Sequence, residues 1–175
     1  MIQRVRQFYR ALTAHISQED RAYIDRSIPD SAKALFYQMH PADQYHALQV
    51  AKTALQLADK SNLTVDRSML LRCALLHDVG RKKGDLDIWG KVFAVLITHF
   101  VPGLAKFIAC KEVDSIWRRP GRAIYVYYHH PEIGAAMLRA IGLYEEAAVI
   151  SRHHQPLAQG DDDLLVILRQ ADEKN

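Results

Sequence analysis

The sequence predicts an all-α fold, and three observations indicate this class. Apolar residues recur at spacings of three and four over several long segments, as on one face of a helix. Sustained alternation of apolar and polar residues is missing, and "AIYVYY" at 123–128 is the one short stretch that could form a strand. Glycine and proline concentrate between the helical segments, at 80–84, 102–103, 120–121 and 156–160.

The length of 175 residues is close to that of one ordinary domain, and the apolar content suffices for a sizeable core. We therefore expect a single domain over 1–175. N-terminal helices are expected over 1–39. The core should follow in two pieces, at about 40–83 and 129–173, with an insert between them at about 84–128.

The first core helix is predicted over 41–59. Pro41 suits the first position of a helix, because its missing N–H would have no partner there. His46 shares a face with Val50 and Leu57, at spacings of four and seven residues. We therefore expect His46 to point inward.

The next helix is predicted over 67–78, "RSMLLRCALLHD", and is apolar nearly all round, which is typical of a buried helix. Gly80 follows it as a common residue for a helix stop. His77 and Asp78 stand at its inner end, and ionisable groups are seldom buried without partners. A metal ion would supply that compensation.

His130 precedes Pro131, which we expect to begin a helix over 131–142. His129 is the alternative to His130 as a functional side chain. Either would lie at the N-terminal end of the predicted helix.

A further helix is predicted over 143–154, "LYEEAAVISRHH", and is stopped by Pro156. His153 and His154 close it on adjacent faces. At least one of the two is expected to face the core.

The last helix is predicted over 161–173 and opens with acidic residues, which suit a helix N-terminus. Leu165, Leu168 and Asp172 share one face at spacings of three and four. A carboxylate in line with two core leucines is the exception on that face. We expect Asp172 to coordinate a ligand.

Imidazole nitrogens and carboxylate oxygens hold borderline and hard divalent metals. An adjacent His-Asp pair alone would occur about 0.7 times by chance, so the dipeptide is weak evidence without its context. The context is the ordered set of inward-facing sites at His46, His77-Asp78, His130, His153-His154 and Asp172. Three other histidines have no place in this order, namely His15, His40 and His99.

The strings "HALQVA", "ALLHDVG", "HHPEIGAAML", "ISRHHQP" and "ADE" resemble the HD superfamily of metal-dependent phosphohydrolases, over roughly residues 40–173. "HPEIG" and "HHQP" look most like the multi-metal branch that includes the HD-GYP phosphodiesterases. Two departures are present: no "GYP" follows "HHQP", and Arg81 stands where that pattern has lysine.

The resemblance implies an HD-domain helical bundle with one or two divalent ions per chain, such as iron, manganese or another divalent ion. One ion would be bound by His46, His77, Asp78 and Asp172. Asp78 would bridge to a second ion, which the resemblance places on His130, His153 and His154.

The function we expect is hydrolysis of a phosphate ester by metal-activated water, with a nucleotide or another phosphorylated metabolite as substrate. Asp78 would orient the water. Basic side chains just beyond the metal pair would bind the phosphate, with Arg81, Lys82 and Lys83 as first candidates and Arg118, Arg119 and Arg122 behind them.

Two other functions stay open. A histidine-rich two-metal site of this kind can also hold a mixed-valent di-iron pair that activates oxygen, and the ligand types alone do not separate the two enzymes. A non-catalytic module that senses a nucleotide or associates with a membrane is the third interpretation.

The region between the metal pair and His130 has a mixed character. Residues 92–105 carry no Lys, Arg, Asp or Glu, yet they are too few to span a bilayer. Residues 81–139 hold ten basic against five acidic side chains. A core helix with a solvated basic rim is favoured, and peripheral membrane contact through 84–128, with Trp89 and Trp117 at the interface, is the alternative.

Composition also bounds the partners and the compartment. A net charge of +3 is too small to argue for duplex nucleic acid. Cys73 and Cys110 show neither metal spacing nor a disulfide framework. The N-terminus interleaves arginines with apolar residues and lacks the apolar run of a signal peptide, so a cytoplasmic location is expected. The oligomeric state stays open.

Overall fold

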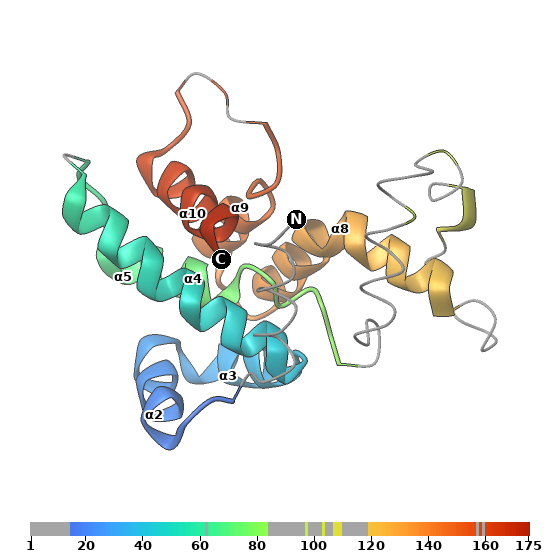
Figure 1. Ribbon diagram of the computed structural model, residues 1–175, viewed down its shortest axis with the longest axis horizontal. Helices are drawn as coiled ribbons and strands as arrows, with labels where there is room; N and C mark the ends of the chain where they lie inside the picture. The colour runs from blue at the N-terminus through green and yellow to red at the C-terminus, as the bar shows by residue number, and fades with distance from the viewer. Residues whose placement is uncertain are drawn as a thin grey trace.

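The computed structural model describes residues 15–61, 63–83, 97, 103, 107–109, 119–156, 158 and 160–175. Within these residues the chain is helical and contains no strand, so the predicted all-α fold is confirmed. The helices are α2 (Gln18–Ser27), α3 (Asp30–Tyr37), α4 (Pro41–Lys60), α5 (Arg67–Leu76), α8 (Arg119–Ala140), α9 (Tyr144–Ile150) and α10 (Asp163–Lys174), as Figure 1 shows.

Helix α4 begins at its predicted residue, and α10 begins two residues after its predicted start at 161. Pro41 is the first residue of α4, and the His40 side chain caps it by accepting a hydrogen bond from the Ala42 amide. Asp162 caps α10 in the same way through the Leu164 amide. These caps satisfy amides that have no partner inside the helix.

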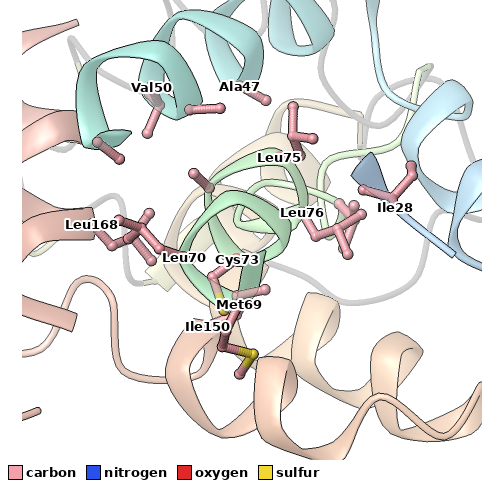
Figure 2. Close-up of a cluster of buried hydrophobic side chains, with 14 of the residues drawn as sticks. Ile28, Ala47, Val50, Met69, Leu70, Cys73, Leu75, Leu76, Ile150 and Leu168 are labelled. Carbon is pink, nitrogen blue, oxygen red and sulfur yellow. The ribbon is translucent and has the colours of Figure 1, made fainter. Parts of the chain in front are cut away.

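Helix α5 lies at the centre of the core and contacts α2, α4, α9 and α10. Its side chains Leu70 and Cys73 belong to one buried cluster with Val50 of α4, Ile150 of α9 and Leu168 of α10 (Figure 2). Full burial of a leucine side chain stabilises a fold by about 2 kcal/mol. The apolar side chains on nearly all sides of α5 therefore pack against neighbouring helices, as predicted.

Helix α8 differs from the prediction in two ways. Pro131 lies inside a continuous helix and does not begin one, and the strand-like stretch 123–128 is helical. Ala123 and Val126, three residues apart, pack together on one face, because burial of a helical face outweighs the strand preference of β-branched and aromatic residues. The predicted boundary between the insert over 84–128 and the core piece that begins at 129 therefore falls inside α8.

Two helix ends also differ from the prediction. Helix α5 ends at Leu76, so His77 and Asp78 lie in the turn that follows, and α9 ends at Ile150, so His153 and His154 lie in turns as well. Gly80 does not end a helix through a positive φ. It packs against α8, where a Cβ atom on Gly80 would lie 2.2 Å from the carbonyl oxygen of His130.

An ion pair fixes α9 on α5. The Arg72 Nε atom donates to Glu146 Oε1 at 2.6 Å, and the carboxylate of Glu146 is buried. Among the described helices, none combines the length and the apolar character that crossing a bilayer requires. His99, Trp89, Trp117, Arg118 and Cys110 lie outside the described residues.

Candidate metal centre

The histidines and aspartates singled out in the sequence come together at one place in the fold. They come from α4, the turn after α5, α8, the turn after α9, and α10. The ring centroid of His77 lies 5.4 Å from those of His46 and His153, and the ring of His130 lies 5.4 Å from that of His153. Segments separated by more than a hundred residues thus build one site.

Three of the side chains form a first cluster: His46, His77 and Asp172. One ligand atom of each lies within 4.8 Å of the others, a spacing that could hold a metal ion. The His46 Nε2 atom lies 3.0 Å from Asp172 Oδ1, and His77 Nε2 lies 3.6 Å from the same oxygen. The carboxylate that interrupts the apolar face of α10 therefore has two imidazole partners.

A second cluster consists of imidazoles alone, on His130, His153 and His154, and its ligand atoms also lie within 4.8 Å of one another. His130 and His153 are buried, whereas His154 is exposed. The rings of His153 and His154 are 4.1 Å apart, and that of His154 is 4.9 Å from His130. Both histidines of the dipeptide thus face the site.

Asp78 lies between the two clusters and is 1% exposed. Its Oδ2 atom is 3.6 Å from His77 Nε2 in the first cluster, and its Oδ1 atom is 3.3 Å from His130 Nε2 in the second. A carboxylate with one oxygen toward each cluster is the arrangement that can bridge two metal ions.

Three of the histidines are oriented by the same backbone contact. The Nδ1 atoms of His77, His130 and His153 lie 2.8, 3.0 and 2.7 Å from carbonyl oxygens three residues earlier in the chain, those of Ala74, Tyr127 and Ile150. A carbonyl can only accept, so each Nδ1 carries the proton and donates. Each Nε2 atom is thereby directed toward the site, as in histidines that ligate metals.

Pro131 explains how the Tyr127 carbonyl is available in the middle of α8. In an uninterrupted helix this carbonyl would accept from the amide of residue 131, but proline has no N–H. The Nδ1–H group of His130 takes that acceptor at 3.0 Å. The proline that was predicted to start a helix instead helps to aim the adjacent histidine.

Several polar atoms of the site are buried without a hydrogen-bond partner within the described residues. They include His77 Nε2, His153 Nε2 and Asp78 Oδ1. Buried polar atoms of this kind cost free energy unless something satisfies them. A divalent cation accepts electron pairs from all three, so the donor set fits a metal.

The two clusters differ in charge, because the first favours ionised side chains and the second favours neutral imidazoles. Burial would lower the pKa of His77, but Asp78 and Asp172 outweigh it and raise that pKa to about 9. Burial would raise the pKa of Asp172, but His46 and His77 outweigh it and hold it well below its usual range. In the second cluster burial is the largest cause, and it lowers the pKa of His153 to about 3 and also lowers the pKa values of His130 and His154.

Arg81 contacts the centre directly. Its Nη1 atom donates to Asp78 Oδ2 at 2.8 Å, and its Nη2 atom donates to His130 Nε2 at 3.0 Å. Burial would raise the pKa of Asp78, but Arg81 and the neighbouring histidines outweigh it and lower that pKa. The neighbouring Lys82 and Lys83 are exposed.

The other histidines and arginines considered in the sequence lie away from the two clusters, as far as the structure describes them. His40 caps α4, His15 is exposed, and His129 is exposed with its ring 4.4 Å from that of Tyr125. The alternative of His129 as a ligand is therefore not supported by its position. Arg122 lies over the Tyr125 ring at 5.7 Å, and the side chain of Arg119 lies outside the described residues.

Gly134 shapes the site, although it is not among the residues that the sequence predicts for it. A Cβ atom on Gly134 would lie 3.2 Å from the amide nitrogen of Gly80, so two glycines meet where α8 crosses the turn that carries Asp78. The available signal was a glycine inside an otherwise helical segment, which often marks close packing.

Comparison with known families adds one match. The family model described as the HD domain matches residues 44–115, a segment that contains His46, His77 and Asp78. No curated protein and no solved structure matches the chain. The helical fold and the two ligand clusters agree with this match, which supports membership of the HD superfamily.

Proposed function

We propose that this chain is a metal-dependent phosphohydrolase that cleaves a phosphate ester of a nucleotide or of another phosphorylated metabolite. The observation that carries the proposal is the placement of buried Asp78 between two three-ligand clusters, with one carboxylate oxygen toward each. The match to the HD domain, which suggests metal-dependent phosphohydrolases, supports it.

The first ion would be held by His46, His77, Asp172 and Asp78, and any second ion by the three imidazoles of the other cluster with Asp78. Iron, manganese or another divalent ion suits these ligands. A bound divalent ion supplies positive charge to a phosphoryl oxygen and makes a bound water acidic enough to lose its proton near neutral pH.

The chain's own residues would position the reactants. The carboxylate of Asp78 accepts hydrogen bonds and would orient the attacking water. The guanidinium of Arg81 would donate to a phosphoryl oxygen, since its planar fork matches the geometry of phosphate. Lys82 and Lys83 are exposed beside Arg81 and would attract the charged substrate at longer range.

The all-imidazole cluster also supports a place in the multi-metal branch of the superfamily. His130 belongs to "HPEIG" and the other two histidines to "HHQP", the elements that resemble that branch. Because the "GYP" signature is missing after "HHQP", we propose a phosphate ester as substrate and do not narrow it to a cyclic dinucleotide.

The first test is elemental analysis of protein purified without a metal-chelating tag, with Asp78→Ala beside it. Glu173→Ala is a matched control, because it removes an exposed carboxylate next to Asp172 in α10. The parent and the control should carry the same metal and release phosphate from a nucleotide panel and from p-nitrophenyl phosphate. Asp78→Ala should lose metal and turnover while keeping its helical circular dichroism.

An Asp78→Ala variant that hydrolysed the same substrate at the parent rate would contradict the assignment. A chain that bound no metal even after reconstitution would favour a non-catalytic module that senses a nucleotide. Nucleotide binding without turnover, together with liposome co-sedimentation, would identify that module.

The second candidate function is an oxygenase with a mixed-valent di-iron pair. The observation that favours it is the cluster of three imidazoles beside a carboxylate, because these ligands suit iron as well as redox-inert ions. Iron in the purified protein and consumption of oxygen with a candidate substrate would support the oxygenase. Manganese and release of phosphate would support the hydrolase.

A further inference from the structure

Arg81 occupies the place where the two ligand clusters meet. Its guanidinium donates one hydrogen bond to Asp78 Oδ2 at 2.8 Å and another to His130 Nε2 at 3.0 Å. We propose that Arg81 supplies the second positive charge of the centre, so that the chain binds one divalent ion tightly and a second ion only by displacing this guanidinium. The inference rests on the proposed metal centre and concerns how many ions that centre holds.

The competition follows from the state of His130. Its Nδ1–H group donates to the Tyr127 carbonyl, which leaves Nε2 as the one ring atom that can accept a hydrogen bond or bind a metal. Arg81 donates to that same Nε2 atom. A metal ion on His130 therefore requires that Arg81 first release it.

An ion in the first cluster meets weaker competition from Arg81. The Asp78 Oδ2 atom accepts a hydrogen bond from Arg81, yet a carboxylate oxygen keeps a second lone pair for a metal ion. The two hydrogen bonds of Arg81 go to Asp78 and His130, whereas His46, His77 and Asp172 contact one another. The first cluster also has a carboxylate of its own, and the second has imidazoles alone. A divalent cation is thus attracted to the first cluster by Asp172 in addition to Asp78, whereas in the second cluster the guanidinium already occupies one of the three imidazoles.

The backbone around Arg81 holds it in this place. The Lys83 amide donates to the Gln38 carbonyl at 2.8 Å, and Met39 and Lys82 form an antiparallel bridge. On the other side, Gly80 lies against the backbone of His130. The segment 80–83 is therefore tied both to the loop before α4 and to α8.

The arrangement gives Arg81 a role in substrate binding as well. A guanidinium has five N–H donors, and the contacts with Asp78 and His130 use two of them. The remaining donors can bind a phosphate oxygen while the ion in the first cluster binds another. A substrate phosphate would then lie between one metal ion and one arginine.

The test is the number and affinity of Mn²⁺ ions bound by the purified full chain. Equilibrium dialysis with elemental analysis gives the number, isothermal titration gives the two affinities, and electron paramagnetic resonance detects a coupled ion pair. The parent chain should bind one ion tightly and a second at least about a hundredfold more weakly.

Removal of the guanidinium by Arg81→Ala should allow a second tight ion and produce the coupled signal. Arg81→Lys keeps a positive charge without the second donor nitrogen that reaches His130, so its second ion should bind more tightly than in the parent chain and more weakly than in Arg81→Ala. Adding His130→Ala to Arg81→Ala should return the number to one. Arg139→Ala is the matched control, because it removes an exposed arginine near the end of α8, and it should behave like the parent.

Two tight ions of similar affinity in the parent chain would overturn the inference and leave the proposed metal centre standing, even if Arg81→Ala did not fold. A single ion in a folded Arg81→Ala chain would overturn it as well. Failure of the parent to bind any ion would overturn the metal centre itself, and with it the inference.

Discussion

Gly80 packs directly against the backbone of His130, and no side chain fits between them. A Cβ atom at Gly80 would lie 2.2 Å from the His130 carbonyl oxygen and 2.9 Å from the amide nitrogen of Gly134. Both neighbours are backbone atoms of α8 and cannot rotate away. The distance between Asp78 and His130 therefore depends on the absence of a side chain at Gly80.

Replacing Gly80 by alanine should push α8 away from the turn that carries Asp78. We expect Gly80→Ala to lower the free energy of unfolding by about 2 kcal/mol and to weaken metal binding more than tenfold. Gly134→Ala should have the same effects to a smaller degree, because its closest contact would be 3.2 Å. Thermal melts and metal titrations of both variants measure this order, and equal or reversed effects would contradict it.

Pro131→Ala tests how His130 is aimed. Alanine restores an amide that can donate to the Tyr127 carbonyl, so it competes with the Nδ1–H group of His130. The helix should be no less stable, while His130 should populate both neutral tautomers. Nitrogen-detected NMR of the imidazoles measures this, with His77 and His153 as internal controls. An unchanged His130 spectrum would show that the proline has no part in the orientation.

Metal uptake should release a proton from His77. In the ion-free chain its pKa is raised to about 9 by Asp78 and Asp172, so the ring is protonated at pH 7, whereas a metal ligand must be neutral. The apparent affinity should therefore rise with pH and level off above about pH 9. Calorimetry in buffers of different ionisation enthalpy counts the protons. An affinity that did not change between pH 7 and pH 9 would contradict this prediction.

Arg72→Ala should destabilise the junction between α5 and α9. It leaves the buried carboxylate of Glu146 without its partner at 2.6 Å, and loss of one member of a buried pair costs about 3 kcal/mol. The matched variant Arg67→Ala removes an exposed arginine from the same helix and should cost less than about 1 kcal/mol. Urea unfolding of the two variants compares these costs.

The parts of the fold that could be predicted are those governed by local rules. Helix α4 follows from Pro41 and from the helical spacing of its apolar residues, and α5 from its apolar character on nearly all sides. The site residues could be proposed because a carboxylate or imidazole on an apolar face, as at Asp172, needs a partner. No such rule gave the distances between them.

The parts that could not be predicted depend on contacts between distant segments. Pro131 usually marks a helix start, and here the side chain of His130 compensates for its missing amide. The position of Gly80 after an apolar helix predicts a helix stop, whereas the structure requires glycine there because α8 approaches so closely. The bond from Arg81 to His130 spans 49 positions, and nothing in the local sequence around either residue indicates it.

The shared contact of His77, His130 and His153 with a carbonyl three residues earlier separates two properties of the centre. The tautomer and direction of each ring are encoded within five consecutive residues at most, with Pro131 counted for His130, whereas the distances between the clusters require segments from across the chain. Damage to the packing should therefore scatter ligands that each remain correctly aimed. A short segment grafted onto another helical scaffold would carry its ring direction with it, and the new scaffold would have to provide only the spacing.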